Sequence, residues 1–281
     1  MGIVLGIDIG GSMTKIVGFS QHNNLLGEQQ VKATDQITSM YGAIGNFLRK
    51  YHLSLNDIDK IVLTGVGASF FDDDIYGIST LKVDEFIAIG YGGLYLAQTD
   101  EAFIVSMGTG TAFVRAEKNH ITHLGGSGVG GGTLLGLSSI MLNKHDIDAV
   151  LDLAENGYAE KVDLLVKDII SRDIPSLPPN LTASNFGNVK SNASEADIAI
   201  GIINMIIQTV GMLAAFVSKN DTIKCFIMTG TLSTLPQAKE IFDAIGEMHG
   251  IKFIIPYNAV FATAIGAAVS YMNGVVDRSP G

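Results

Sequence analysis

An aspartate and a lysine flank a glycine turn near the start of the chain. The apolar run that begins at Ile3 ends in Asp8, the turn follows, and a second apolar run resumes after Lys15. In such a turn, backbone N–H groups and hydroxyls can approach phosphate oxygens, while Asp8 can hold a hydrated Mg²⁺ and Lys15 adds positive charge. The pattern predicts a strand, a phosphate-binding turn and a second strand, with an ordinary glycine hairpin as the alternative. The turn residues are Gly10, Gly11, Ser12, Met13 and Thr14.

Residues 125–137 form a second glycine-rich stretch, which runs directly into a helical pattern. Flexible backbone that opens into a helix N-terminus makes an anion site. The stretch contains Gly126-x-Gly128-x-x-Gly131, but a dinucleotide fingerprint also needs a βαβ unit, which is not expected here. We expect phosphate binding, because three separate glycine and hydroxyl turns in the chain share that requirement. A loop that needs flexibility for packing is the alternative.

The two halves of the chain share one pattern. Each opens with a strand, a glycine and hydroxyl turn and a second strand, and each later carries a β-rich run that ends in Thr-Gly, at residues 64–65 and 229–230. An insertion between about residues 125 and 195 interrupts the second half. The repeat predicts an α/β protein with two related lobes, residues 1–100 and 101–281, and a cleft between them.

Helical patterns fill the spaces between these strands. The apolar residues from Ile37 to Leu48 recur at helical spacing, and Asp35 is the expected N-cap. Prolines predict an irregular loop at residues 175–180, because proline removes a backbone donor and restricts the residue before it. Further helices are expected at residues 132–142, 197–217, 236–249 and 260–272.

Composition excludes several classes of protein. The chain has 281 residues, 47% of them hydrophobic and 16% charged, and a formal net charge of -10. This composition predicts a compact globule, and the absence of basic clusters argues against a nucleic-acid surface. The single cysteine, Cys225, lies in an apolar run, where we expect a buried strand residue. One cysteine allows no intrachain disulfide and no cysteine-based metal centre, which suits a reducing cytoplasm.

No membrane segment is expected. The first residues lack the basic, apolar and cleavage regions of a signal peptide. The most lipid-like window, residues 198–217, contains Asn204 and Gln208 and follows two acidic residues. We therefore expect a buried core helix there and a cytoplasmic protein.

Three turns together resemble the phosphate-binding elements of the sugar kinase, Hsp70 and actin superfamily: residues 8–15, 107–111 and 229–231. More narrowly, the chain is similar to type II pantothenate kinases over nearly its whole length, with the most specific matches at residues 125–137 and 180–187. The resemblance implies two actin-like (ribonuclease H-like) lobes with mixed sheets and an interlobe nucleotide cleft. It also implies a homodimer that uses ATP and Mg²⁺ to phosphorylate pantothenate to 4'-phosphopantothenate, the first step of coenzyme A biosynthesis.

The resemblance implies roles for individual residues. Asp8 would organise Mg²⁺, and the first turn with Lys15 would surround the β- and γ-phosphates. Glu85 matches the catalytic base of the family, whereas local sequence alone would place Asp84 and Glu85 at the N-terminus of a helix. The remaining nucleotide path would be lined by Gly108, Thr109, Gly110, Gly131, Gly132, Thr133, Leu134, Leu135 and Thr231.

The acceptor side departs from the family pattern. His123 stands where members usually carry an arginine that can clamp the substrate carboxylate, Ala112 stands where they carry a serine, and Ile255 replaces a tyrosine. A kinase for a different small hydroxylated substrate and a weakly active nucleotide- or coenzyme-A-binding regulator are therefore alternatives. An ATPase activator with an iron–sulfur cluster is disfavoured, because cluster ligation needs several cysteines. A sugar kinase is disfavoured by residues 180–187.

Overall fold

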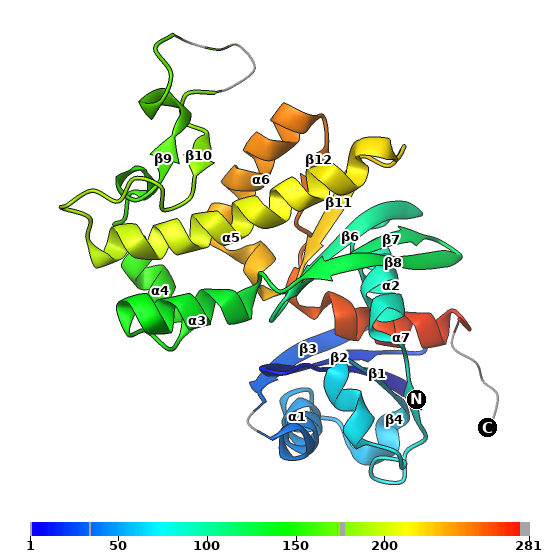
Figure 1. Ribbon diagram of the computed structural model, residues 1–281. Coiled ribbons are helices and arrows are strands. Elements are labelled where there is room, and N and C mark those ends of the chain that lie inside the picture. The colour runs from blue at the N-terminus through cyan, green and yellow to red at the C-terminus, as the bar shows by residue number, and fades with distance from the viewer. Residues whose placement is uncertain (1, 34, 173, 175–177, 276–281) are drawn as a thin grey trace.

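Two mixed β-sheets with helices between and around them make up the computed structural model, which describes residues 2–33, 35–172, 174 and 178–275 (Figure 1). Each sheet has five strands and belongs to one half of the chain. Helices lie in the layer between the sheets and on their outer faces, and further helices of the second half extend away from its sheet. This architecture confirms the expected α/β fold with two lobes.

The first sheet has the strand order β3-β2-β1-β4-β5, in which β1 is antiparallel to β2 and parallel to β4. Every residue of β1 is buried, in agreement with its continuous apolar run, because both faces of a central strand are covered. One of these faces packs against a helix. Asp35 is the N-cap of this helix, as expected, because its Oδ1 accepts a hydrogen bond from Thr38 N at 2.6 Å. The elements are β1 (Ile3–Ile9), β2 (Met13–Phe19), β3 (Leu25–Lys32), α1 (Gln36–Lys50), β4 (Ile58–Thr64) and β5 (Thr80–Lys82).

The second sheet repeats the first strand for strand, in the order β8-β7-β6-β11-β12. Its central strand β6 is antiparallel to β7 and parallel to β11, as β1 is to β2 and β4. The glycine after β4, Gly65, has φ 85° and ψ 165°, and the glycine after β11, Gly230, has φ 85° and ψ 170°. The halves are therefore repeats, as expected. The strands are β6 (Glu101–Met107), β7 (Thr111–Glu117), β8 (His120–Ser127), β11 (Cys225–Thr229) and β12 (Lys252–Ile254).

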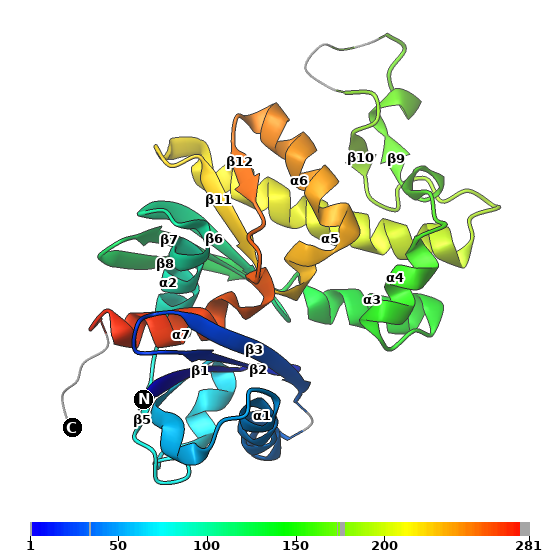
Figure 2. The same cartoon turned by 180° about the vertical axis from the view of Figure 1, so that it is seen from behind.

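The helices α2 (Glu85–Ala97) and α7 (Ala262–Met272) form the layer between the sheets (Figures 1 and 2). Their backbones touch, because a Cβ at Gly92 would collide with the carbonyl oxygen of Ala262, and one at Gly266 would collide with that of Ala88. The α2 helix packs on the second sheet, and α7, the last helix of the chain, packs on the first. Each half therefore covers one face of the sheet of the other half.

The second lobe carries the insertion and a large apolar core. Its longest helix, α5, packs against α3, α4 and α6, and contributes Ile202 and Ile206 to that core. In the described part of the chain, residues Glu195–Asn220 are the only segment long and apolar enough to cross a membrane, and half of this window is buried in the protein. The remaining elements are α3 (Gly131–Leu142), α4 (Ile147–Ala154), β9 (Leu164–Leu165), β10 (Thr182–Ser184), α5 (Glu195–Val217) and α6 (Pro236–His249).

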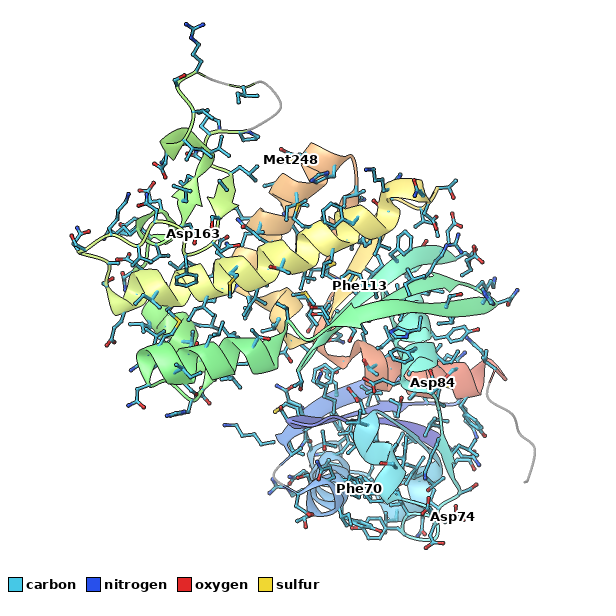
Figure 3. All side chains as sticks on the ribbon, viewed as in Figure 1. Phe70, Asp74, Asp84, Phe113, Asp163 and Met248 are labelled. Atoms are coloured by element: carbon cyan, nitrogen blue, oxygen red, sulfur yellow. The ribbon has the colours of Figure 1, made fainter. Side chains whose placement is uncertain are left out.

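A buried aspartate ties the insertion to α5. Asp163, labelled in Figure 3, is fully buried. Its carboxylate accepts hydrogen bonds from Phe186 N at 2.9 Å and from Asn204 Nδ2 at 2.7 Å. The segment at residues 180–187 is thereby held on α5, because a buried carboxylate is stabilised only where donors surround it.

Several boundaries differ from expectation. The strand β8 extends to Ser127, into the glycine-rich stretch that begins at residue 125. The helix α5 begins two residues before position 197, because Ser194 and Asp197 form a capping box there. Cys225 lies in a strand, as expected, but is only partly buried. Residues 175–177 of the expected proline loop lie outside the described residues, and Pro178 lies in no helix or strand.

Candidate active site

Asp8 lies near the carboxyl end of the central strand β1, between Lys15 on β2 and Thr64 on β4. The three side chains share the face of the sheet that carries Val4, which packs in the cluster around α7, because alternate residues of a strand face the same side. Asp8 is 8% exposed and Lys15 is 9% exposed. The buried Thr64 hydroxyl has no hydrogen-bond partner among the described residues. The row Thr64–Asp8–Lys15 therefore points a carboxylate, an ammonium and a free hydroxyl toward the layer between the lobes.

Gly65 allows the backbone at the end of β4 to lie close to the Asp8 side chain. Its φ of +85° lies in the left-handed region, and a Cβ there would sit 2.6 Å from Asp8 Oδ1. A residue other than glycine would strain the backbone and press on the carboxylate. Thr64 and Gly65 are absent from the site expected from sequence; the Thr-Gly pair repeated at residues 229–230 is the signal that could identify them.

Glu85 is the first residue of α2, and its neighbour Asp84, labelled in Figure 3, is the N-cap. Asp84 Oδ1 accepts hydrogen bonds from Phe86 N at 2.9 Å and from Ile87 N at 3.1 Å. The structural role that local sequence suggests for this acidic pair therefore falls to Asp84. The carboxylate of Glu85 remains available for chemistry.

The pKa values of Glu85 and Asp8 show that the two carboxyl groups share one environment. Burial raises the pKa of Glu85, the negative charges of Asp8 and Asp84 raise it further, and Lys15 opposes the shift. Burial likewise raises the pKa of Asp8, against the effect of Lys15. The fold thus brings Asp8 and Lys15, from β1 and β2, close enough to Glu85 of α2 for their charges to act on it.

The two glycine turns of the second lobe join into one unit. Gly131 N donates to Gly108 O at 2.8 Å, and Gly132 N donates to Thr109 O at 2.9 Å. Because the first N–H groups of α3 are used in this way, they are not free for an anion. Thr133 braces the same unit, since its Oγ1 donates to Gly128 O at 2.8 Å. The turn at 108–110 and the start of α3, which lie about 20 residues apart in sequence, are therefore one structural element.

A third element closes on this unit. Thr231 begins a short 3₁₀-helix directly after Gly230, and a Cβ at Gly230 would collide with the carbonyl oxygen of Met107, the last residue of β6. Thr231 is half-buried. The expected turns at residues 107–111 and 229–231 and the glycine-rich stretch at residues 125–137 therefore converge at the carboxyl ends of β6 and β11.

Not every expected residue turns its side chain to the cleft. Leu134 is 1% exposed and packs in the core of the second lobe, and Leu135 beside it is half-buried. Thr14 is fully buried on the face of the first sheet opposite Asp8, because it pairs with Ile9, and its hydroxyl has no partner among the described residues. The rest of the first turn is open: Gly11 and Ser12 are exposed, and Gly10 and Met13 are partly exposed.

A β-bulge sets the position of His123. Val114 pairs with His123 and Phe113 with Gly125, so Leu124 is the extra residue of β8. The His123 ring stacks on Phe86 with ring centroids 3.6 Å apart and planes inclined by 8°. Ala112 packs in the same cluster as Phe86. His123 therefore lies beside the start of α2, and Ala112 lies on the same face of the sheet, two residues beyond Val114, the strand partner of His123.

Comparison with known proteins decides the family. The model of the Fumble family matches residues 98–239, which is just over half of the chain. The chain belongs to the Fumble family. It is 29% identical to a type II pantothenate kinase of Staphylococcus haemolyticus, over 96% of this chain and 99% of the relative. It is 28% identical to a type II pantothenate kinase of Bacillus cereus, over 94% of this chain and 96% of the relative.

Solved structures resemble this member of the Fumble family in fold. An activator of 2-hydroxyisocaproyl-CoA dehydratase from Clostridium difficile, with bound ADPNP, has a TM-score of 0.70 and 16% identity, covering 99% of this chain and all of that one. A ROK family glucokinase from Streptomyces griseus, in complex with glucose and AMPPNP, has a TM-score of 0.62 and 12% identity, covering 95% and 98%. At these identities the likeness shows the shared actin-like fold.

The residues around Asp8 fit a divalent cation held together with a nucleotide. Asp8 is buried, burial raises the pKa of its carboxyl group, and the positive charge of the neighbouring Lys15 favours the ionised form, as a bound cation would. Mg²⁺ binds by one or two carboxylates and substrate phosphates, with water in its other positions. No group of three or more acidic, histidine or cysteine residues in the described part could hold a metal by itself. One carboxylate beside an exposed glycine turn fits a metal that arrives with its nucleotide.

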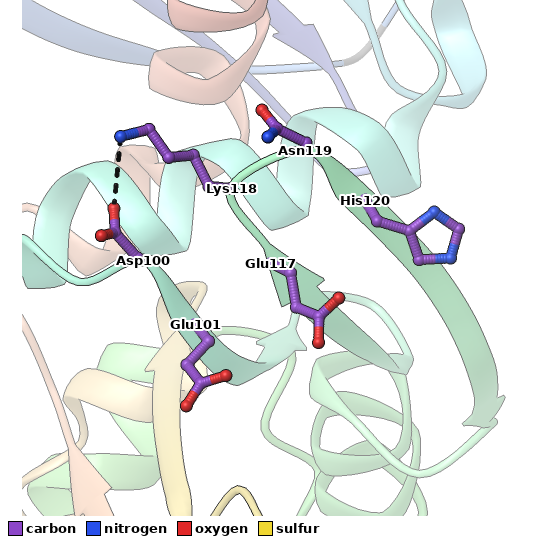
Figure 4. A pocket seen from close by; sticks show the side chains of 6 residues that line it. All are labelled: Asp100, Glu101, Glu117, Lys118, Asn119 and His120. Atoms are coloured by element: carbon purple, nitrogen blue, oxygen red, sulfur yellow. Dashed lines mark ion pairs between the residues drawn. The ribbon is translucent and has the colours of Figure 1, made fainter.

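A separate hollow of about 400 Å³ lies at the opposite end of the second sheet (Figure 4). Glu101 begins β6 there and Glu117 ends β7, whereas the glycine turn follows the other end of β6. The hollow is lined by polar side chains, and Lys118 pairs with Asp100 at 3.8 Å. It is therefore distinct from the glycine turns at the other end of β6.

Proposed function

We infer that this protein transfers the γ-phosphoryl group of ATP to the primary hydroxyl of pantothenate, giving 4'-phosphopantothenate for coenzyme A biosynthesis. The observation that carries the proposal is the meeting of Glu85, Asp8 and Lys15 between the lobes of a chain that aligns with type II pantothenate kinases over nearly its full length. A base, a metal-side carboxylate and a cation are the groups that phosphoryl transfer to an alcohol requires.

The nucleotide would lie between the first turn and the joined glycine turns of the second lobe. Backbone N–H groups of Gly11 and Ser12, which are exposed, would face the β- and γ-phosphates, and Lys15 would neutralise part of their charge. Asp8 would hold Mg²⁺ on the phosphates, and the metal supplies neutralisation of the charge that develops during transfer. Thr109 and Thr231 would border the remainder of the nucleotide.

Glu85 would act as the general base. Its carboxylate accepts the proton of the acceptor hydroxyl while the hydroxyl oxygen forms a bond to the γ-phosphorus. The bond between that phosphorus and the β–γ bridging oxygen breaks, and ADP leaves with its electron pair. A base with a raised pKa accepts this proton more readily, provided that it is ionised at the working pH.

A kinase for a different small alcohol is the second candidate, and His123 is the observation that favours it. An imidazole stacked on Phe86 cannot form the paired hydrogen bonds with which a guanidinium recognises a carboxylate. His123 can offer one directed hydrogen bond. An acceptor without a carboxylate would therefore suit this pocket as well as pantothenate does.

The proposal includes a homodimer, a cytoplasmic location and a division of the chain near residue 100. The family resemblance supports the dimer, and the single cysteine supports a reducing compartment. The strand repeat supports two units of the proposed extent, 1–100 and 101–281.

The test is ATP consumption with pantothenate, pantetheine, glucose and further sugars, each with and without Mg²⁺. The proposal expects turnover with pantothenate that exceeds turnover with every sugar and that requires Mg²⁺. Turnover with a sugar but not with pantothenate would favour the second candidate. Nucleotide binding without turnover of any acceptor would favour a regulatory homologue.

A further inference from the structure

Two rows of residues face the interlobe layer, one from each sheet, and they occupy equivalent positions. The first row is Thr64–Asp8–Lys15. In the second sheet, Ser106 pairs with Thr229 on β11 and with Ala112 on β7. Because the strand orders are the same and both threonines precede the glycines with matching φ and ψ, Ser106 is the counterpart of Asp8.

Ser106 faces the layer that holds Glu85. Ile104, two residues earlier on β6, packs on α2, since a Cβ at Gly93 would lie 2.5 Å from Ile104 Cδ1. Alternation places Ser106 on the same face as Ile104. Ser106 is half-buried, and its hydroxyl has no hydrogen-bond partner among the residues that the structure describes.

The course of α2 over the second sheet shows what lies in front of Ser106. Gly90 sits against Ile121, and Phe86, one turn earlier, stacks on His123. Two strand residues span about the same length as one helical turn. Ala112 and Ser106 lie two residues past the strand positions that pair at His123, so they lie about one helical turn before the first residue of α2. Both side chains are only partly buried, and they lie on the N-terminal side of α2, which begins at Glu85.

The two rows differ in charge. The first row carries Asp8 and Lys15, which suit a metal–phosphate group, whereas the second row carries only neutral, small side chains. Asp8 already acts on Glu85 through its negative charge, so a carboxylate at position 106 would add a further repulsion. Serine retains hydrogen bonding without that charge, and Ala112 leaves room next to it. The second row is therefore suited to a neutral polar group of an organic molecule.

We propose that Ser106 is an acceptor-binding residue, whose hydroxyl hydrogen-bonds a neutral hydroxyl or amide group of the alcohol substrate next to the hydroxyl that Glu85 deprotonates. This inference rests on the proposed function and adds to it the floor of the acceptor pocket. The nucleotide is bound from the first row and the glycine turns, and the acceptor is bound from the second row. Duplicated halves thus serve two different substrates.

The experiment compares Ser106→Ala with Ser106→Thr, which keeps the hydroxyl, and with Thr122→Ala on β8 as a control. Steady-state kinetics with pantothenate and ATP give each KM and kcat, and calorimetry with AMPPNP gives the nucleotide affinity. Loss of one hydrogen bond is expected to raise the pantothenate KM of Ser106→Ala about tenfold. The KM for ATP and the AMPPNP affinity should stay within twofold. Ser106→Thr should restore most of the pantothenate KM, and Thr122→Ala should match the wild type.

The outcomes separate this inference from the proposed function. If the wild type phosphorylates pantothenate and Ser106→Ala has an unchanged pantothenate KM, Ser106 does not bind the acceptor, while the proposed function stands. A loss of AMPPNP affinity in Ser106→Ala also overturns the inference, because it places Ser106 on the nucleotide side. A wild type that leaves pantothenate unphosphorylated overturns both proposals. An unchanged thermal midpoint in Ser106→Ala excludes misfolding as the cause of its kinetic change.

Discussion

The imidazole ring of His123 lies flat on the phenyl ring of Phe86, with centroids 3.6 Å apart and planes inclined by 8°. Phe86 directly follows Glu85, and the bulge at Leu124 brings His123 onto the face of β8 that meets α2. Stacking leaves only the edge of the imidazole to offer hydrogen bonds. The proposed acceptor pocket therefore has one directional polar group beside the proposed base.

His123 is expected to set the preference for the acceptor. His123→Arg should lower the KM for pantothenate about fivefold to tenfold, because a guanidinium can pair with its carboxylate through two hydrogen bonds. His123→Ala should raise that KM without changing the KM for ATP. His120→Ala is the control, since His120 lies on the same strand but lines the hollow at the far end of the sheet. Equal KM values in all four proteins would remove His123 from the acceptor site.

Glu85→Gln tests the base. The amide keeps the size of the side chain but cannot accept the proton, so kcat should fall by about 10²–10⁴-fold while the AMPPNP affinity remains unchanged. Asp84→Ala is the matched control, because it removes the cap of α2 and should cost about 1 kcal/mol of stability with little effect on kcat. Turnover that survives in Glu85→Gln would assign the proton to another group.

The pH dependence of kcat/KM should follow the raised pKa of Glu85. A general base works in its ionised form, so activity should fall as the pH decreases through a value above the ordinary 4.5 of a glutamate. Asp84→Asn keeps a good N-cap and removes one of the negative charges that raise this pKa. Its acidic limb should therefore move to lower pH. A limb that does not move, or one that moves upward, would contradict the assignment.

Gly65→Ala is expected to disable the metal side of the site. The new Cβ would meet Asp8 Oδ1 in a backbone conformation that costs about 1–3 kcal/mol for a residue with a side chain. Magnesium-dependent AMPPNP binding should weaken, as measured by calorimetry. Gly77→Ala has a similar positive φ of +72° but no neighbour within 4 Å. Equal losses of nucleotide affinity in both variants would show that backbone strain alone, without the contact to Asp8, explains the effect.

Protonation of Asp197 should lower the free energy of unfolding in acid. Burial raises its pKa, but hydrogen bonds from Ser194, Tyr158 and Lys161 prevail and lower the pKa to about 2. An aspartate in the unfolded chain has a pKa of about 3.9, so the stabilisation is complete above that pH and is lost as the pH falls toward 2. In urea unfolding between pH 2 and 6, Asp197→Asn should show a flatter pH dependence than wild type. A wild-type slope in this variant would exclude the mechanism.

Local features of the fold are predictable from sequence. The strand–turn–strand units, the cap at Asp35 and the bounds of α6 all depend on residues within one turn or one strand. Their signals are apolar periodicity, capping side chains and glycine. The meeting of Asp8 and Glu85 follows from the family resemblance rather than from spacing, because β1 and α2 are far apart in the chain.

Features that depend on strand register are not predictable in this way. The side chains of Thr14 and Leu134 point away from the layer between the sheets. Strand register and packing decide on which face of its strand or helix a residue lies. The bulge at Leu124 and the approach of Gly65 to Asp8 likewise arise between strands that pair only in the folded chain. The Thr-Gly pair repeated at residues 64–65 and 229–230 is the one local signal that could indicate the approach of Gly65 to Asp8.

The exchange of α2 and α7 between the halves has a consequence for folding. A fragment that ends near residue 100 would leave β1 without its C-terminal helix, and the complementary fragment would leave β6 bare where α2 belongs. Neither piece can bury its own apolar surface, so calorimetry of the intact chain should record a single cooperative melting event, and co-expressed fragments should be recovered only as a pair.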